Sequence, residues 1–491
     1  MNIIATRDIE PEECPVVEGE GTILESYTSY LTDESKMDCQ PVSAIYFPQN
    51  TAQVVDAVKK TVGRGERIVV SASRTGIVGG AVGVENASII SLERMSAQLG
   101  DWRFQAGVKL EDIPSTQSEY YPLDPTEMTA SLGGTVATDA SGARTYHYGS
   151  TRDFIKALTV VLADGTVLEL RRGDVTCENG KFVLERPNGE TVIPVVNISM
   201  PPVKNTAGLY LRDGMDIVDL FVGSEGTLGI VTEVEIETAP LPAERLFLIV
   251  YADTEDQAIE LVETVKSDTR TTCLALEYFD PSAVALLLDN EALPNLPLDA
   301  KCAVYLEILM ENEDTEGVID EVLASCGLSG DATWAGLNEN DLQEMKKFRH
   351  MVPETVNTII GRLKRDIPQL HKIGTDTAVP EGKLREFLSI ARSAIEKDGL
   401  EYVVFGHIGD NHLHINMLPG SLQELEKAED LFLRIARESV RLGGTVSAEH
   451  GIGRLKIHLL KIQFSEDELN AMKAVKDALD PERVLNPGVM F

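Results

Sequence analysis

The chain has 491 residues, enough for two or three domains with full hydrophobic cores, and 43% of its residues are hydrophobic. With 44 Lys and Arg against 79 Asp and Glu, its formal charge is −35, which excludes nucleic acid and anionic lipid as natural partners. No apolar run reaches the ~18 residues of a transmembrane segment, and the acidic first residues lack a signal-peptide core, so we expect a cytoplasmic enzyme.

The cysteines are scattered and form no Cys-x-x-Cys pair, which indicates reduced thiols in place of disulfides or an iron–sulfur site. They are Cys14, Cys39, Cys177, Cys273, Cys302 and Cys326.

Residues 1–40 are acidic and are predicted to be an irregular N-terminal arm. Asn50 is placed to cap a helix over 51–63, with Val54, Val55, Val58 and Val62 on one face. A strand over 67–71 leads into a loop of small residues, 73–80, where consecutive backbone N–H groups can bind an anion.

Two further loops of small residues follow, at 130–142 and 221–230, beside predicted strands over 157–162 and 231–236. Three such loops suggest one long phosphate-bearing ligand that is held at several points. No Gly-x-Gly-x-x-Gly follows a strand and no Gly-Lys-Ser/Thr loop occurs, so Rossmann and P-loop folds are excluded. Gly180, Asn188 and Gly189 indicate a hairpin within 171–216.

Pro240-Leu241-Pro242 is a plausible domain boundary. Beyond it, strands over 245–251, 272–279 and 303–309 alternate with helices over 256–266 and 316–326, as in an antiparallel sheet with helices on one face. Arg349 is expected on a helix that stops at Pro353. A capping box at Ser465-Glu466-Asp467-Glu468 opens a last helix that ends near Leu479.

Four of the eight histidines lie in two segments, 405–416 and 447–453. Predicted strands over 402–405 and 413–418 flank a turn at 409–411, which can bring His407 and His414 together. With Glu449 as a third donor, this set suits a borderline divalent ion, and His450 is a candidate base. The alternative to a metal or catalytic site is that these histidines are structural and make their hydrogen bonds within the core or a loop.

Several of these motifs, in this order, resemble the vanillyl-alcohol-oxidase/PCMH flavoprotein superfamily. They are the segments 132–138, 148–153 and 221–230. The His-rich segments and Asp480-Pro481…Asn486-Pro487-Gly488 resemble its D-2-hydroxyacid dehydrogenase branch, which includes D-lactate dehydrogenase, the glycolate oxidase FAD subunit and D-2-hydroxyglutarate dehydrogenase. The resemblance covers about residues 40–491.

The resemblance implies an α+β fold in which C-terminal helices return to the FAD-binding domain. The implied parts are an arm (1–40), a PCMH-type FAD-binding domain (41–240), a cap domain with an antiparallel sheet flanked by helices (241–420) and a C-terminal helical segment (421–491). The implied FAD-binding residues are Ser73, Arg74, Thr75, Gly76, Gly79, Gly80, Pro125, Thr126, Ser131, Gly133, Gly134, Ala137, Thr138, Ser141, Gly142, Gly226, Gly229, Ile230 and Asn486.

The first loop departs from the family pattern, because Val70-Ser71-Ala72-Ser73-Arg74 stands where Pro-Arg-Gly-x-Gly is usual. The hydroxyls of Ser71 and Ser73 and the charge of Arg74 are expected to replace the lost donors to the pyrophosphate. The loop contains no His or Cys, so no covalent link to FAD is expected there.

The activity that the resemblance implies is oxidation of a D-2-hydroxy acid by hydride transfer to flavin N5. His450 would be the base, Arg349 the carboxylate clamp, and Asn416 and Lys372 further substrate contacts. His407, His414 and Glu449 would hold a divalent ion (zinc, manganese or iron). His412 stands where the family usually has Asn, and it is expected as part of the sheet or as a partner of a metal ligand.

Electrons would pass to a partner protein: an electron-transferring flavoprotein, a cytochrome or an iron–sulfur subunit. Alkyl transfer, as in ether-lipid synthesis, and a pure electron-relay subunit are the alternatives. The chain length of the hydroxy acid and the choice between monomer and homodimer stay open.

Overall fold

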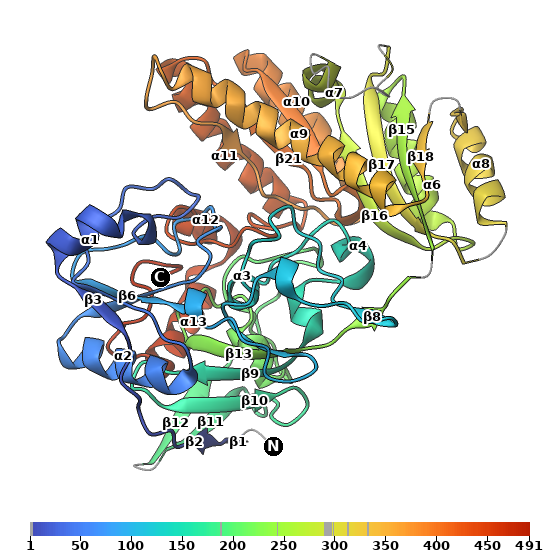
Figure 1. Ribbon diagram of the computed structural model, residues 1–491. Helices are drawn as coiled ribbons and strands as arrows, with labels where there is room; N and C mark the ends of the chain where they lie inside the picture. Colours follow the sequence, from blue (N-terminus) through green and yellow to red (C-terminus); the bar gives the residue numbers. More distant parts are fainter. Residues whose placement is uncertain are drawn as a thin grey trace.

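The computed structural model describes residues 3–186, 189–242, 244–288, 297, 299–311, 314–330 and 333–491. Figure 1 shows two parts: a lower one with several small sheets, and an upper one built on a large sheet with long helices. The mixed α and β content and the antiparallel second sheet confirm the predicted fold class.

The first sheet of the lower part is four-stranded and mostly parallel, because β4 and β5 both run parallel to β6. In sheet order its strands are β3 (Val16–Glu18), β4 (Ala44–Tyr46), β6 (Ala87–Ser91) and β5 (Arg67–Ser71). Helix α2 (Thr51–Gly63) buries Val54, Val55 and Val58 against it, and the Asn50 side chain accepts a hydrogen bond from Gln53 N–H. The predicted helix, cap and strand are confirmed.

A five-stranded antiparallel sheet lies beside the first and supports the second and third loops. In order it contains β2 (Thr6–Arg7), β10 (Val167–Arg171), β9 (Ile155–Val161), β13 (Ile230–Ile236) and β7 (Arg103–Gln105). The predicted hairpin is also present, since β11 (Lys181–Arg186) pairs with β12 (Gly189–Pro194); Asn188 lies outside the described residues.

The prediction that residues 1–40 are irregular is wrong. Strand β1 (Ile3–Ile4) pairs with β11, β2 pairs with β10, and β3 pairs with β4. Ile23 and Leu31 are completely buried. These strands have only two or three residues, too few for a period-2 pattern to show in the sequence.

Short elements complete the lower part. They are α1 (Glu20–Ser26), α3 (Leu132–Thr138), α4 (Thr145–Tyr148), α5 (Ile217–Phe221), β8 (Glu119–Tyr120), β14 (Ala239–Pro240), and the 3-10 turns η1 (Thr28–Tyr30), η2 (Leu92–Arg94), η3 (Leu110–Asp112) and η4 (Thr151–Phe154).

The upper part is a seven-stranded sheet in which every pairing is antiparallel. In order it contains β18 (Thr333–Gly336), β15 (Arg245–Ala252), β17 (Cys302–Leu309), β16 (Cys273–Phe279), β20 (Tyr402–Gly406), β21 (His414–Met417) and β19 (Ile373–Gly374). The three strands predicted after Pro240 are confirmed within two residues at each end.

Helices cover both faces of this sheet, not one as expected. Leu246, Leu248 and Val250 of β15 pack with α6 (Glu255–Ser267), α8 (Thr315–Ser325), α10 (Leu384–Asp398) and α11 (Leu422–Arg441). Phe247 and Ile249, which alternate with them, pack with α7 (Pro281–Leu288) and α9 (Glu339–Leu363). Side chains of a strand alternate between its two faces, so β15, hydrophobic on both, needs cover on each.

Pro353 does not end the helix that carries Arg349, so this prediction is wrong. Helix α9 continues to Leu363 with Pro353 inside it. Phe348, Val352 and Val356 are completely buried on its inner face, and this packing outweighs the hydrogen bond that Pro353 cannot donate.

The last helices return to the lower part, as expected. Helices α12 (Ile457–Gln463) and α13 (Glu466–Leu479) bury Leu459, Met472 and Val475 in its main core. The capping box of Ser465 and Glu468 is present. After α13 the backbone at Leu485 forms a parallel bridge with Ile68 of β5. Among the described residues, no helix is both long and apolar enough to span a membrane.

Candidate functional site

A cavity of about 420 Å³ runs between the three loops of small residues. Seventeen of the nineteen predicted FAD-binding residues line it, so the structure brings the three loops together. The exceptions are Gly79, which packs against Met37 and Arg454, and Ile230, which begins β13. His407, Glu449 and His450 line the same cavity.

Close backbone packing explains why glycine stands at two of these positions. A Cβ on Gly226, whose φ is +68°, would lie 2.6 Å from Asn486 Nδ2. A Cβ on Gly133 would lie 2.6 Å from the Cβ of Ala106. Neither position therefore has room for a side chain larger than hydrogen.

Asn486, from a distant part of the chain, links the end of β5, which leads into the first loop, to the third loop. Its Oδ1 accepts a hydrogen bond from Val70 N–H (2.8 Å), and its Nδ2 donates to the Glu225 carbonyl (2.7 Å). Both side-chain groups are therefore used to fix loop backbone beside the cavity.

The atypical first loop keeps the backbone shape that glycine would allow, because Arg74 adopts φ +60°. Its guanidinium lies 3.3 Å from Glu93 and 4.4 Å from the Tyr30 ring centre, so its charge is already partly neutralised. The buried hydroxyls of Ser71 and Ser141 have no hydrogen-bond partner among the described residues, and both line the cavity. A bound polar ligand such as the FAD pyrophosphate would satisfy them.

The predicted strand–turn–strand at the histidines is confirmed. β20 ends at Gly406, the turn η6 (Ile408–Asp410) follows, and Asn411 adopts the left-handed conformation before β21 begins at His414. The turn brings the rings of His407 and His414 to 5.7 Å between centroids.

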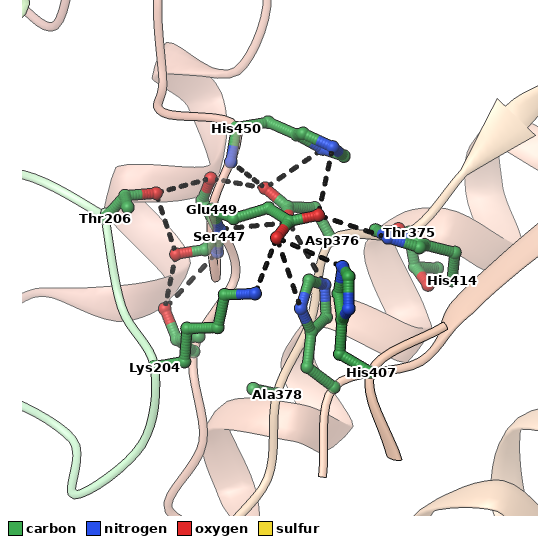
Figure 2. A network of polar contacts seen from close by, with 12 residues as sticks. Lys204, Thr206, Thr375, Asp376, Ala378, His407, His414, Ser447, Glu449 and His450 are labelled. Carbon is green, nitrogen blue, oxygen red and sulfur yellow. Dashed lines mark hydrogen bonds and ion pairs between the residues drawn. The ribbon is translucent and has the colours of Figure 1, made fainter. Parts of the chain in front are cut away.

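Glu449 lies at the centre of the cluster, and Figure 2 shows its carboxylate surrounded by basic side chains. His407 Nε2 is 3.3 Å from Oε2, and His414 Nε2 is 3.2 Å from Oε1. Lys204 Nζ lies 2.5 Å from Oε2. These cations and imidazoles hold the pKa of Glu449 well below its usual range, with the Lys204 charge as the largest lowering contribution against burial.

The donor atoms around Glu449 suit a divalent ion. One atom from each of His407, His412, His414 and Glu449 lies within 4.8 Å of the others. Imidazole nitrogens with one carboxylate oxygen are a usual ligand set for zinc, iron and related ions.

His450 is held beside the cluster by Asp376. Its Nδ1 lies 3.4 Å from Asp376 Oδ2, and its ring is stacked on that of His414, 5.3 Å away at 16°. Burial lowers the pKa of His450 to about 4, although the Asp376 charge opposes this shift. The ring is therefore neutral at pH 7 and able to accept a proton.

Arg349 is buried on α9 and has carboxylates near it without hydrogen-bonding either. Its guanidinium lies 3.6 Å from Asp124 and 3.7 Å from Glu277. Those carboxylates accept their short bonds elsewhere, from Lys346 (2.9 Å) and His407 (2.8 Å). Arg349 therefore makes no hydrogen bond to either carboxylate, and it is not among the residues that line the cavity.

The two other predicted substrate contacts, Asn416 and Lys372, also lie outside the cavity wall. Asn416 is buried in β21, where its Oδ1 lies close to Gly374 of β19. Lys372 is half-buried before β19, and among the described residues it has no hydrogen-bond or ion-pair partner; burial lowers its pKa. Neither side chain lines the main cavity.

Three members of the cluster were not predicted as site residues: Lys204, Asp376 and Glu277. Asp376 lies four positions after Lys372, a predicted substrate contact, and this proximity was the available signal; Lys204 lies in none of the motifs described above. Glu277 lies in the middle of a strand pattern, and nothing near it in sequence distinguishes it.

Known families and proteins are similar to this chain over most of its length. Residues 241–490 match the family of FAD linked oxidases, C-terminal domain, and residues 42–171 match the FAD binding domain family. Glycolate oxidase subunit GlcD of Bacillus subtilis (strain 168) is 27% identical over 96% of this chain and 92% of that protein. A D-lactate dehydrogenase of Anaerostipes hadrus is 28% identical (89% and 87%), and a D-2-hydroxyglutarate dehydrogenase of Stutzerimonas stutzeri (strain A1501) is 27% identical (96% and 95%).

Among solved structures, an alkyldihydroxyacetonephosphate synthase is similar with a TM-score of 0.66. The match covers 98% of this chain and 86% of that one at 16% identity, so it supports the fold alone.

Proposed function

Since the chain belongs to the family of FAD-linked oxidases, we propose that it oxidises a D-2-hydroxy acid of the lactate, glycolate or 2-hydroxyglutarate class to the 2-oxo acid. The observation that carries the proposal is one juxtaposition. His407, Glu449 and His450 line the same cavity as the three small-residue loops, so proton-accepting groups lie at the wall of the cofactor cavity.

His450 is proposed to accept the proton of the substrate hydroxyl. Its neutral ring can take a proton, and the Asp376 carboxylate, 3.4 Å from Nδ1, would stabilise the imidazolium that results. Asp376 is fixed in turn by Ser447 and by the ammonium of Lys456, 2.7 and 2.8 Å away. Burial of this network keeps the base in one orientation.

Arg349 is proposed to bind the substrate carboxylate through two parallel hydrogen bonds. Asn416 and Lys372 are proposed as secondary contacts, because β19 and β21 place them at the same edge of the cap sheet. Bound FAD would supply the flavin that accepts the hydride. A divalent ion (zinc, manganese or iron) held by His407, His414 and Glu449 would supply a Lewis acid.

Electrons would leave through a partner: an electron-transferring flavoprotein, a cytochrome or an iron–sulfur subunit. All six cysteines are free, which supports a reducing, cytoplasmic location.

We also propose domain limits at residues 40, 240 and 420, and a homodimer as the oligomeric state. Limited proteolysis and light scattering test them.

The test of function is anaerobic mixing of the purified FAD-loaded protein with D-lactate, glycolate and D-2-hydroxyglutarate, with L-lactate and L-2-hydroxyglutarate as controls. Bleaching of the flavin absorbance by a D-substrate or glycolate is expected, and a chelator should slow it. No bleaching with any hydroxy acid would contradict the proposal and favour alkyl transfer or electron relay. Bleaching that a chelator leaves unchanged would remove only the metal.

A further inference from the structure

Two of the three clustered imidazoles share one arrangement, in which one ring nitrogen faces an oxygen acceptor and the other faces Glu449. His407 Nδ1 lies 2.8 Å from Glu277 Oε1, and its Nε2 faces Glu449. His414 Nδ1 lies 3.3 Å from the Thr375 carbonyl, and its Nε2 faces Glu449. Metal-binding histidines usually donate their second N–H to such an acceptor, which fixes the ring orientation.

His412 repeats this arrangement. Its Nε2 lies 3.3 Å from Asp376 Oδ1, and its Nδ1 lies 4.0 Å from Glu449 Oε2. The side chain is completely buried, yet neither nitrogen makes an aligned hydrogen bond with the described residues. A buried ring without partners is costly, so the site is incomplete at His412.

We propose that His412 is a fourth metal ligand, through Nδ1, so that the ion is held by three imidazoles and one carboxylate. Ligand atoms about 2.1 Å from a tetrahedral ion are about 3.4 Å apart. His407 Nε2 already lies at this spacing from Glu449 Oε2 (3.3 Å), and His412 Nδ1 needs to approach the same oxygen by about half an ångström. His414 Nε2 lies 3.2 Å from the other carboxylate oxygen, Oε1.

A competing donor set lies within the same 4.8 Å: Asp376, His414, Glu449 and His450. It is disfavoured because the Asp376 carboxylate is already engaged by four hydrogen-bond donors. It accepts hydrogen bonds from Ser447 Oγ and Lys456 Nζ, and from the backbone N–H groups of Glu449 (3.2 Å) and His450 (3.1 Å). The His412 nitrogens have no such commitments.

Three imidazoles change the selectivity of the site. Imidazole suits zinc and iron, whereas oxygen-rich sites suit manganese and magnesium. The inference rests on the metal site of the proposed function and adds to it that zinc or ferrous ion binds more tightly than manganese.

The test measures metal binding, not turnover. Zn²⁺ and Mn²⁺ affinities of the chelator-treated, FAD-loaded protein are measured by competition titration, for the native chain, for His412→Asn and for His371→Asn, which changes an exposed histidine. His412→Asn is expected to weaken Zn²⁺ at least tenfold and to reduce the preference for Zn²⁺ over Mn²⁺. His371→Asn should change neither. X-ray absorption of the native zinc-loaded protein should count three imidazoles, a measurement that does not depend on how the variant folds.

Unchanged Zn²⁺ affinity in His412→Asn, or two imidazoles in the native spectrum, would overturn the inference while leaving the metal of the proposed function in place. A native chain that binds no metal would overturn both. Weakened zinc binding in a protein that oxidises no hydroxy acid would uphold the ligand and remove the function.

Discussion

Lys204 Nζ lies 2.5 Å from Glu449 Oε2, although 245 positions separate the two residues in the chain. Both side chains are nearly inaccessible to solvent. The Lys204 ammonium thus contacts the same carboxylate that is proposed to bind a metal, and its positive charge neutralises Glu449 when no metal is bound.

Lys204→Met should therefore destabilise the metal-free protein and leave the metal-loaded protein almost unaffected. Removing one partner of a buried ion pair leaves the other uncompensated, and a lowering of the metal-free Tm by ~5 °C is expected. A bound zinc ion would replace the missing charge. Calorimetry with and without zinc measures this, with Lys473→Met as control. An equal loss of Tm in both states would show that Lys204 acts only in packing.

Gly226→Ala should release FAD. The new Cβ would lie 2.6 Å from Asn486 Nδ2 at a residue whose φ is +68°, so the loop must shift at the cavity wall. The flavin-to-protein absorbance ratio after purification is expected to fall several-fold. Gly63→Ala, at the exposed end of α2, should keep full flavin content. A fully flavinated Gly226→Ala would place the cofactor elsewhere.

His450→Asn should slow flavin reduction by about 10²–10⁴-fold while FAD stays bound, the usual size of a general-base contribution. Stopped-flow absorbance under anaerobic conditions measures the rate. The exposed His458→Asn on α12 is the matched control. Because the pKa of His450 is lowered to about 4, the native rate should be flat between pH 6 and 8 and should fall as the pH drops through about 4. Normal reduction by His450→Asn would exclude it as the base.

Arg349→Lys should weaken substrate binding more than turnover, raising KM by about 10–100-fold, because an ammonium cannot make the two parallel bonds of a guanidinium. Steady-state kinetics with an artificial electron acceptor separate KM from kcat. Lys347→Arg, on the exposed side of the same helix, should leave both values unchanged. An unaltered KM in Arg349→Lys would rule out the carboxylate clamp.

Glu225 should make stability fall as pH rises. Its carboxylate accepts N–H bonds from Ile452 and Gly453, both 2.7 Å, but burial dominates and raises its pKa from 4.5 to about 7. The folded protein binds a proton here that the unfolded chain releases, so this stabilisation is complete below pH 4.5 and is lost as pH rises through 7. The Tm of Glu225→Gln relative to the native chain should increase from pH 5.5 to 8. A constant difference would show that Glu225 does not titrate in this range.

The sequence predicted local features well because their causes are local. The capped helix over 51–63 and the hairpin of the histidines follow from periodicity, Asn50 and the turn residues. The order of the cap strands was not predictable, because strands that pair can be far apart in the sequence. Strand β16, which ends at Phe279, pairs with β20, which begins at Tyr402.

The same limit applies to the site. The His-rich segments identified its centre, but Lys204, Asp376 and Glu277 come from three other regions and carry no motif of their own. Pro353 misled the helix prediction because the cost of a proline is local, whereas the packing of Phe348 and Val352 that offsets it is tertiary.

Asn486 joins the backbone of Val70 to that of Glu225, and the neighbouring residues bridge to Ile68. During synthesis these segments emerge from the ribosome long before position 486 does, so the hydrogen bonds that Asn486 makes to them are missing while translation continues. We therefore expect FAD to bind only after the C-terminal region has been synthesised, so that ribosome-bound chains that lack position 486 carry no flavin.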